Sequence, residues 1–562
     1  MSTYIPPPRI APLALVVRFV ASLAALCVCA NLFAAPPYHR ADKPIVDDQG
    51  RKRIIIDFVD NAHEAFPREL LAQFNPKTSA QQPQVVALVE QYERLLGFKR
   101  VLMTTWVGNS VTAFLNSAQI EQLKLDPKIK LLTEDAYMQY SALWSANWNG
   151  NAWGELNDWG RVAVSGKSVA DLPGGGTGRK VYIIDSGVAD HDDLGSVIQR
   201  VNVACGNGGD CSGLSAPIGY PNPVGYYPTV GCFAHSTHVA GIVGATYNNG
   251  KNRAGVLAGV PIVSVALNTT QGMDPNTGTW IPCAYGPPTV SGIGAAFDYI
   301  YFQNRPVAQS VTSGPNIATM SINPGQVGFA ADGSEQTNRS KLLTMVTPGN
   351  FWSYNYSQNT WIQLYYDGIF FVQSAGNQNQ PSCAPLNGAS LAYQTSFGAT
   401  STANDGIMVV GAITDEGTAA SGTLPQGQSS WFQATQPPGL GDPSFGSNYG
   451  TCLDIWAPGN FIYSTWGKGV DATRGSPASY SGGQPSDYPP PPPINNLNYP
   501  GWAWLSGTSM AAPHVAAAAA YIADKYQLAT PAEIEAKVRQ LSQSYGTTDP
   551  TNTLIKVVHL GP

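Results

Sequence analysis

The sequence predicts an α/β fold, in which a doubly wound, mostly parallel sheet is preceded by a small unit of α+β type. Three observations predict it. Short, continuous apolar segments alternate with helical segments after about residue 141, which is typical of a parallel sheet covered on both faces. Gly- and Pro-rich loops separate these elements. A different alternation of strands and helices occupies about residues 50–137.

The composition excludes several classes of protein. Apolar residues make up 43% of the 562 residues, enough for a sizeable core, so a wholly disordered chain is excluded. Lys and Arg number 31 against 37 Asp and Glu, giving a net charge of -6. Because there is no basic excess, no nucleic-acid partner is expected.

The first 35 residues have the features of a secretory signal peptide. Arg9 and Arg18 are followed by an apolar run from Phe19 to Ala30 and then by small residues. The run is shorter than the ~20 apolar residues of a membrane span. We therefore expect a secreted, extracellular protein with no membrane association after signal removal. An uncleaved anchor is the alternative.

Export would place the cysteines in an oxidising compartment. Cys27 and Cys29 would leave with the signal peptide, so six of the eight would remain. An even number favours disulfides, and no pair has the C-x-x-C spacing of a zinc site. Scattered buried thiols are the alternative. The remaining cysteines are Cys205, Cys211, Cys232, Cys283, Cys383 and Cys452.

The small unit is predicted to have the order β-α-β-β-α-β, a split βαβ arrangement. Apolar residues between Val85 and Leu96 recur at helical spacing, and Ser117 is a candidate cap for a second helix through Leu125. The expected strands are Arg53–Val59, Lys99–Val107, Ser110–Asn116 and Ile129–Leu132.

The large unit is predicted from near-continuous apolar strands and the helices between them. Thr530 to Glu533 form a capping box with Pro531 at the first helical position. The expected strands are Lys180–Ile184, Ile262–Leu267, Ile317–Met320, Ile369–Gln373 and Met408–Ala412, and the expected helices cover about 235–246, 291–303, 509–526 and 531–543.

Long segments interrupt this alternation near 268–290, 326–367, 416–447 and 466–501. The last contains Pro489–Pro493, and five consecutive prolines favour a polyproline II stretch with no role in the core. An inert surface insertion is the simplest interpretation, and a recognition ligand is the alternative.

Three short motifs contain candidate catalytic side chains. Asp185 ends an apolar strand, where parallel sheets place their sites, although many such residues only form turns. His235 opens a small-residue helix, although a lone histidine is often part of a core. Ser509 precedes Pro513 and an alanine-rich helix, so its hydroxyl lies at a helix start, where a serine is often simply a cap.

Taken together, the motifs point to one chemistry. Asp, His and Ser in this chain order form one of the convergent catalytic triads. The surrounding residues, Asp185-Ser-Gly, His235-x-Thr-His-Val-Ala-Gly and Gly507-Thr-Ser-Met-Ala-Ala-Pro-His, resemble those of the subtilisin-like serine peptidases, the subtilases. Within that family the chain resembles most the secreted, disulfide-containing proteinase K/aqualysin type. The resemblance covers about residues 150–562.

The resemblance implies a role for each motif. Ser509 would attack the scissile carbonyl, His235 would take and return its proton, and Asp185 would hold the imidazole. Ser374-Ala375-Gly376-Asn377 matches the oxyanion segment of the family, with Asn377 as the side-chain donor. The implied function is a secreted serine endopeptidase that acts on polypeptides through an acyl-enzyme, is made as a self-processing zymogen, and works as a monomer.

The family also implies a domain organisation. Residues 1–35 would be the signal peptide, 36–140 an inhibitory propeptide of ferredoxin-like fold, and 141–562 the subtilisin-like peptidase domain. The propeptide would act as an intramolecular inhibitor, with its tail from Glu134 to Tyr140 in the active site and self-cleavage between about 135 and 150.

Disulfide pairings are implied by the same comparison. Cys232 with Cys283 and Cys383 with Cys452 match bridges of the aqualysin type, which leaves Cys205 and Cys211 to close a short loop. No cofactor is expected for catalysis. Structural calcium is common in the family, and Asp190, Asp192 and Asp193 are candidate ligands, although a solvated acidic turn is the simpler interpretation.

Two positions depart from the family pattern. Ser236 replaces the usual Gly after the catalytic His. The strand that would bind the substrate backbone, usually Ser-Leu-Gly-Gly, is Ser321-Ile322-Asn323-Pro324 here. Ser321, Ile322, Asn323, Ala375 and Gly376 are the expected substrate-binding residues, and Asn323 leaves the side-chain preference undefined.

Three rival functions share features with this sequence. An α/β-hydrolase esterase requires its acid and His after Ser509, and no suitable pair follows it. A sedolisin-type acid peptidase shares the Gly-Thr-Ser motif but does not use a His like His235. A catalytically inactive subtilase homologue that acts as a binding protein is the main alternative, and the presence of all four catalytic positions argues against it.

Overall fold

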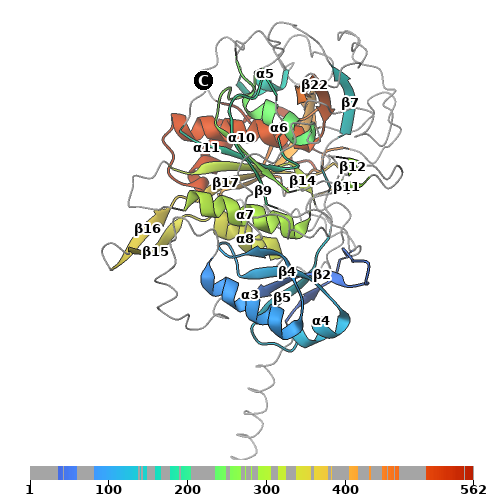
Figure 1. Cartoon of the computed structure of the whole chain (residues 1–562). Helices are drawn as coiled ribbons and strands as arrows, with labels where there is room; N and C mark the ends of the chain where they lie inside the picture. The colour runs from blue at the N-terminus through green and yellow to red at the C-terminus, as the bar shows by residue number, and fades with distance from the viewer. Residues whose placement is uncertain are drawn as a thin grey trace, which may run out of the picture.

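A computed structural model of the chain shows a small N-terminal unit packed against a larger α/β unit (Figure 1). The structure describes residues 36–41, 44–59, 82–136, 139–140, 143–148, 159–165, 178–188, 191–203, 234–247, 254–267, 272–273, 280–281, 289–305, 314–323, 337–355, 360–377, 381, 404–415, 429–431, 446–451, 453–460, 462–466, 501–549 and 551–560.

The large unit is built on a ten-stranded sheet with the order β23-β24-β20-β18-β17-β13-β8-β10-β9, and β19 pairs with β18. The pairs β18–β19 and β23–β24 are antiparallel, and the other pairs are parallel. The strands are β8 (Val181–Asp185), β9 (Val197–Asn202), β10 (Ile262–Ala266), β13 (Asn316–Met320), β17 (Ile369–Ser374), β18 (Ile407–Asp415), β19 (Ser429–Trp431), β20 (Ile455–Pro458), β23 (Gln543–Thr548) and β24 (Leu554–Val557).

Helices cover both faces of this sheet, as predicted (Figure 1). Successive side chains of a strand point to opposite faces, so Val181 and Ile183 of β8 join one core, and Tyr182 and Ile184 join the other. The helices of the first core are α5 (Trp159–Ser165), α6 (Ala234–Gly244), α10 (Thr508–Lys525) and α11 (Pro531–Leu541). Those of the second are α7 (Val290–Asn304) and α8 (Thr337–Val346).

Part of one predicted interruption belongs to this second core. Within 326–367, helix α8 contributes the buried side chains of Leu342, Met345 and Val346. The hairpin of β15 (Gly349–Asn355) and β16 (Thr360–Tyr366) follows it. Within 268–290, β11 (Gly272–Met273) pairs with β12 (Trp280–Ile281). The polyproline segment and the rest of 467–500 lie outside the described residues.

The N-terminal unit has the predicted order of elements. Its sheet has the order β1-β5-β2-β4-β3, and β1 is an edge strand that the sequence did not predict. Asn116, rather than Ser117, caps the second helix and forms a capping box with Gln119. The elements are β1 (Tyr38–His39), β2 (Lys52–Phe58), α3 (Pro83–Leu96), β3 (Arg100–Thr104), β4 (Ser110–Leu115), α4 (Ser117–Leu123) and β5 (Ile129–Glu134).

The N-terminal unit lies against α7 and α8, on the side of these helices away from the central sheet (Figure 1). Beyond it the chain forms β6 (Gln139–Tyr140) and β7 (Leu143–Trp148). Strand β6 pairs with β14 (Ile322–Asn323). Strand β7 joins β21 (Ile462–Trp466) and β22 (Gly501–Ser506) in a three-stranded sheet. Among the described residues, no helix is long and apolar enough to cross a bilayer.

Candidate active site

Asp185 is the last residue of β8, the third strand from the β9 edge of the central sheet. Its side chain is fully buried. The backbone N–H of Ser186 donates to Oδ1 at 2.6 Å, and the Ser186 hydroxyl donates to the same oxygen at 3.1 Å. These two bonds fix the orientation of the Asp185 carboxyl group. Asp185 is therefore a fixed acceptor at the carboxyl edge of the sheet.

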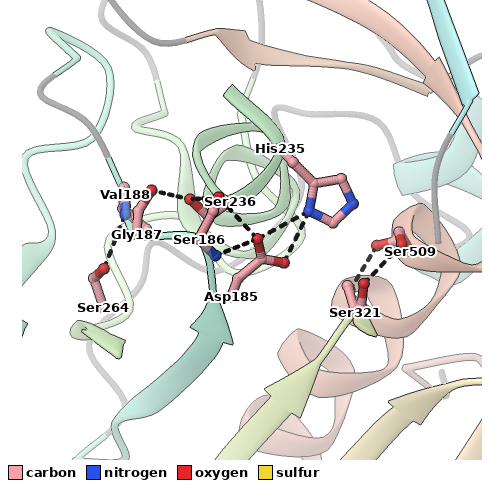
Figure 2. A network of polar contacts seen from close by, with 9 residues as sticks. All are labelled: Asp185, Ser186, Gly187, Val188, His235, Ser236, Ser264, Ser321 and Ser509. Atoms are coloured by element: carbon pink, nitrogen blue, oxygen red, sulfur yellow. Dashed lines mark hydrogen bonds and ion pairs between the residues drawn. The ribbon is translucent and has the colours of Figure 1, made fainter. Parts of the chain in front are cut away.

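His235 is the second residue of α6 and meets this carboxylate. Its Nδ1 lies 3.0 Å from Oδ1 and 2.9 Å from Oδ2 of Asp185 (Figure 2). Because a carboxylate only accepts hydrogen bonds, Nδ1 carries the proton in this contact. In the neutral ring the lone pair is then on Nε2, which is the arrangement a general base requires.

Close packing fixes the helix that carries His235. A Cβ added at Gly241 would lie 2.3 Å from the hydroxyl oxygens of Ser464 and Thr465, so α6 can approach β21 only with glycine there. These hydroxyls donate to the carbonyls of His238 and Thr237, each at 2.7 Å. His238 is fully buried, and its Nε2 lies 3.0 Å from the carbonyl oxygen of Ile462 on β21, so it belongs to this packing.

Ser509 is the second residue of α10, after Gly507 as N-cap. Gly507 has φ 146°, a region that favours glycine. The position gives Ser509 N–H no partner within the helix and places it at the positive end of the helix dipole. Pro513 is the sixth residue of α10, deeper than its predicted place near the start.

The Ser509 side chain lies beyond the imidazole of His235 as seen from Asp185 (Figure 2). Its Oγ donates to the carbonyl of Ser321 at 3.1 Å. Ser321 is the residue between β13 and β14, and its own hydroxyl donates to the Ser509 carbonyl at 3.0 Å. The described contacts thus pair the serine hydroxyl with Ser321, so proton transfer to His235 requires the hydrogen bond to the Ser321 carbonyl to break.

Asn377 is held with its amide in a defined orientation. Its Oδ1 accepts from both N–H and Oγ1 of Thr508, each at 2.9 Å. Because the amide oxygen is bound to Thr508, the Nδ2 group points away from Thr508 as a hydrogen-bond donor. Asn377 is 7% exposed, so this donor lies in a largely desolvated place. The residue before Ser509 therefore orients the amide.

The segment before Asn377 is fixed by its backbone. Gly376 has φ 99°, which favours glycine, and its N–H donates to Thr508 Oγ1 at 3.0 Å. The Asn448 side chain donates to the Ala375 carbonyl at 2.8 Å. The expected substrate-binding residues Ala375 and Gly376 thus lie beside Thr508, next to Ser509.

The predicted substrate strand is β14. Ile322 is paired with Tyr140, and Asn323 is paired with Gln139, in an antiparallel register. The structure therefore places a segment of the chain on the strand that was expected to bind a substrate backbone. Pro324 lies outside the described residues.

Several contacts around the candidate site were not predicted from the sequence. Thr508 and Asn448 orient the oxyanion segment, and Ser236 contacts both Ser186 and the Gly187 carbonyl. Thr508 lies inside the serine motif, and Ser236 was recognised as a departure from the family pattern, but neither contact could be read from these positions. All six cysteines of the predicted disulfides lie outside the described residues, as does Asp190. Among the described residues, no group of three or more candidate ligands is placed to hold a metal ion.

Comparisons with known proteins agree with this arrangement. A model described as the subtilase family matches residues 176–553. Alkaline serine exoprotease A of Vibrio alginolyticus is 23% identical over 495 residues, which are 85% of this chain and 66% of that protein. The subtilisin-like serine protease AsES of Sarocladium strictum is 25% identical over 418 residues, 73% of this chain and 69% of that protein. The chain thus spans about two thirds of the length of these relatives.

A solved structure shows the same fold. Fervidolysin from Fervidobacterium pennivorans, described as a keratinolytic enzyme related to subtilisin, has a TM-score of 0.51 and 17% identity, and the match covers 94% of this chain and 62% of that one. The family match covers more than half of the chain and includes Asp185, His235, Asn377 and Ser509. The chain therefore belongs to the subtilase family.

Proposed function

We propose that this chain is a serine endopeptidase that hydrolyses peptide bonds through an acyl-enzyme. The observation that carries the proposal is the contact of 2.9 Å between His235 Nδ1 and the buried carboxylate of Asp185, on the side of the ring away from Ser509. A buried Asp-His pair of this kind beside a serine at a helix start is the arrangement that activates a hydroxyl for acyl transfer.

Each group has one step to perform. Ser509 Oγ attacks the carbonyl carbon while its proton passes to Nε2 of His235, and the resulting imidazolium is stabilised by Asp185. Asn377 Nδ2 and the Ser509 N–H would donate to the oxyanion. His235 then protonates the leaving amine. A water molecule, deprotonated by the same imidazole, hydrolyses the acyl-enzyme and restores Ser509.

The decisive experiment replaces the nucleophile. Ser509→Ala should lower casein hydrolysis by about 10⁶-fold and leave the precursor unprocessed, because members of a triad act as a unit. Ser542→Ala, in which the altered hydroxyl lies at the end of α11, is the matched control and should be unchanged. Wild-type protein without activity would support the inactive-homologue alternative, and full activity at pH 4 would support an acid peptidase.

The proposal includes an inhibitory role for the N-terminal unit. One carboxylate oxygen of Asp298, on α7, accepts N–H bonds from Thr105, Trp106 and Val107 at 3.1, 2.5 and 2.9 Å. A buried ion pair of 2.9 Å joins Lys341 on α8 to Asp57 on β2. These contacts support residues 36–140 as a folded propeptide bound to the peptidase domain 141–562.

A third contact joins the two units through a buried charge pair. Arg53 and Asp135, both fully buried, form an ion pair of 2.8 Å. Ser291 on α7 completes it: its hydroxyl donates to Asp135 at 2.6 Å and accepts from Arg53 at 2.8 Å. Because a broken buried pair leaves an uncompensated charge, this contact favours one docking geometry.

The proposal has four further parts: secretion after removal of residues 1–35, disulfides of the proteinase K/aqualysin type, structural calcium and a monomeric state. Support for secretion comes from the apolar N-terminal run and the even number of remaining cysteines. Mass spectrometry of the secreted protein, with and without reduction, tests the cleavage after the signal and the three disulfides together. A free thiol count of six would contradict the disulfides.

A further inference from the structure

Strand β22 leads directly into the nucleophile. It ends at Ser506, and α10 with Ser509 begins two residues later, at Thr508. One edge of β22 is paired along its length with β21, from Leu505 opposite Ile462 to Gly501 opposite Trp466. Because β21 is bonded to α6 through Ser464 and Thr465, this hairpin is part of the fixed frame of the site.

The other edge of β22 pairs with β7. The register is antiparallel, with Ser506 opposite Leu143 at the catalytic end and Trp502 opposite Trp148 at the far end. Strand β7 therefore starts beside the serine motif and runs away from it over six residues. Figure 1 shows β7 alongside β22 on the side of the molecule remote from the N-terminal unit.

The same stretch of chain reaches the site from both sides. Strand β6 ends at Tyr140, paired with Ile322, the residue after Ser321, whose carbonyl accepts the Ser509 hydroxyl. Strand β7 begins at Leu143. The segments before and after residues 141–142 are thus both added to strands that adjoin Ser509.

We propose that β14 and β22 together form an extended site for a polypeptide main chain, in which β22 binds about six residues on the leaving-group side of the bond that is cut. The proposal rests on the proposed peptidase function and deepens it. The chain's own segment from β6 to β7 is the first occupant, and self-processing cuts it between Tyr140 and Leu143. Cleavage frees β7, and the edge of β22 then accepts substrates by main-chain hydrogen bonds, largely independent of side chains.

Peptides with the chain's own sequence test the site. All start at Ala136, and they end at Leu143, at Ser145 or at Trp148. Because strand pairing adds roughly one hydrogen bond per residue or less, kcat/KM should rise about tenfold from the shortest to the longest peptide. A kcat/KM that is the same for all three would overturn the proposal.

N-methylation separates main-chain pairing from side-chain contacts. In an antiparallel pair, only every second residue bonds to a given neighbouring strand, so only one of the N–H groups of Trp144 and Ser145 should face β22. N-methylation of that residue in the longest peptide should abolish the increase in kcat/KM, and N-methylation of the other residue should leave most of it. Equal effects at the two positions would contradict strand addition on β22.

N-terminal sequencing of the processed protein tests the position of the cut. The mature chain should start at residue 141, 142 or 143, and a start anywhere else would refute this part of the proposal. If the peptidase function itself were wrong, the wild type would cut none of the peptides, like Ser509→Ala. If the wild type cuts all of them equally, the function stands and the extended site does not.

Discussion

Ser321 and Ser509 exchange hydrogen bonds between hydroxyl and carbonyl groups: Ser509 Oγ donates to Ser321 O at 3.1 Å, and Ser321 Oγ donates to Ser509 O at 3.0 Å. The second bond has a cause inside α10. The residue four positions after Ser509 is Pro513, which has no N–H, so the Ser509 carbonyl lacks the helical donor it would otherwise have. Ser321 supplies that donor and thereby anchors the backbone of the proposed nucleophile.

This relationship predicts that Pro513→Ala should partly compensate for the loss of the Ser321 hydroxyl. Ser321→Ala should lower kcat up to about tenfold, because a net hydrogen bond contributes about 0.5–1.5 kcal/mol. In a Pro513→Ala background, residue 513 offers an N–H to the Ser509 carbonyl, so the same Ser321→Ala change should cost less. A double-mutant cycle on kcat measures the difference. Additive effects would show that Ser321 does not act through this carbonyl.

The Asn377 amide should contribute to turnover more than to binding. Asn377→Ala should lower kcat by about 10²- to 10³-fold with little change in KM, the loss known for the corresponding side chain in a subtilisin and carried over here by family. Thr508→Val removes only the hydroxyl that holds Oδ1 and should give a smaller loss. Steady-state kinetics on one peptide compares the two, and a purely KM effect of Asn377→Ala would exclude the oxyanion role.

Replacement of Ser186 should lower kcat/KM more than replacement of Ser236. The Ser186 hydroxyl has one proton and two acceptors, Asp185 Oδ1 at 3.1 Å and Ser236 Oγ at 3.2 Å. Ser186→Ala removes a donor to the carboxylate and should lower kcat/KM about tenfold. Ser236→Gly leaves Ser186 free to donate to Asp185, so its effect should stay below about threefold. A larger loss in Ser236→Gly would reverse this assignment.

The Asp298 carboxylate should control release of the N-terminal unit. Asp298→Ala leaves three N–H groups without their acceptor and should shorten the lag before activity appears after processing. The complex should weaken by about 100-fold or more, since bonds to a charged group contribute about 1.5–3 kcal/mol. Asp298→Asn keeps an acceptor oxygen and should be intermediate. An unchanged lag in both variants would argue against this anchor.

Acid should loosen the N-terminal unit near Glu134. Burial raises the pKa of Glu134, but hydrogen bonds from Lys52, Tyr38 and the Ala41 N–H outweigh burial and hold the pKa below its ordinary 4.5. Because the folded-state pKa is depressed, the stabilisation is present above about pH 4.5 and is lost as the pH falls through the lowered value.

Hydrogen exchange on the unprocessed Ser509→Ala chain measures this effect. The Leu132 N–H, which bonds to the Pro37 carbonyl at 3.0 Å between β5 and the chain before β1, should lose protection as the pH falls below about 4.5, after correction for the intrinsic exchange rate. Glu134→Gln should lower protection at neutral pH and remove the dependence. A steep dependence retained in Glu134→Gln would assign it to another group.

Local patterns predicted most of the fold. The apolar runs of β8, β10, β13, β17 and β18 are buried in a parallel sheet, and their position in the sequence was right to within about two residues at nearly every end. Helix α8 was missed because its mixed composition lacks a clear apolar periodicity, although its buried face completes a core. The formation of α8 therefore depends on tertiary packing more than on a local sequence pattern.

The candidate site, like the fold, was predicted from the sequence only in part. Asp185, His235, Asn377 and Ser509 could be proposed from the sequence because each lies in a motif, and the structure places the Asp185 carboxylate 2.9 Å from His235 Nδ1. The Ser321–Ser509 exchange and the β7–β22 pairing join residues far apart in the chain, through main-chain groups that every residue possesses. No residue-type pattern carries such information, so only the folded chain shows it.

Asp298 accepts hydrogen bonds from three successive main-chain N–H groups of the N-terminal unit, those of Thr105, Trp106 and Val107. This contact depends on the conformation of the main chain, and the Trp106 side chain adds to it, with its ring centroid 5.8 Å from that of Phe302 on α7. A cyclic peptide that presented three converging amides in the same main-chain conformation would therefore compete with the N-terminal unit for this carboxylate, at a distance from the candidate triad.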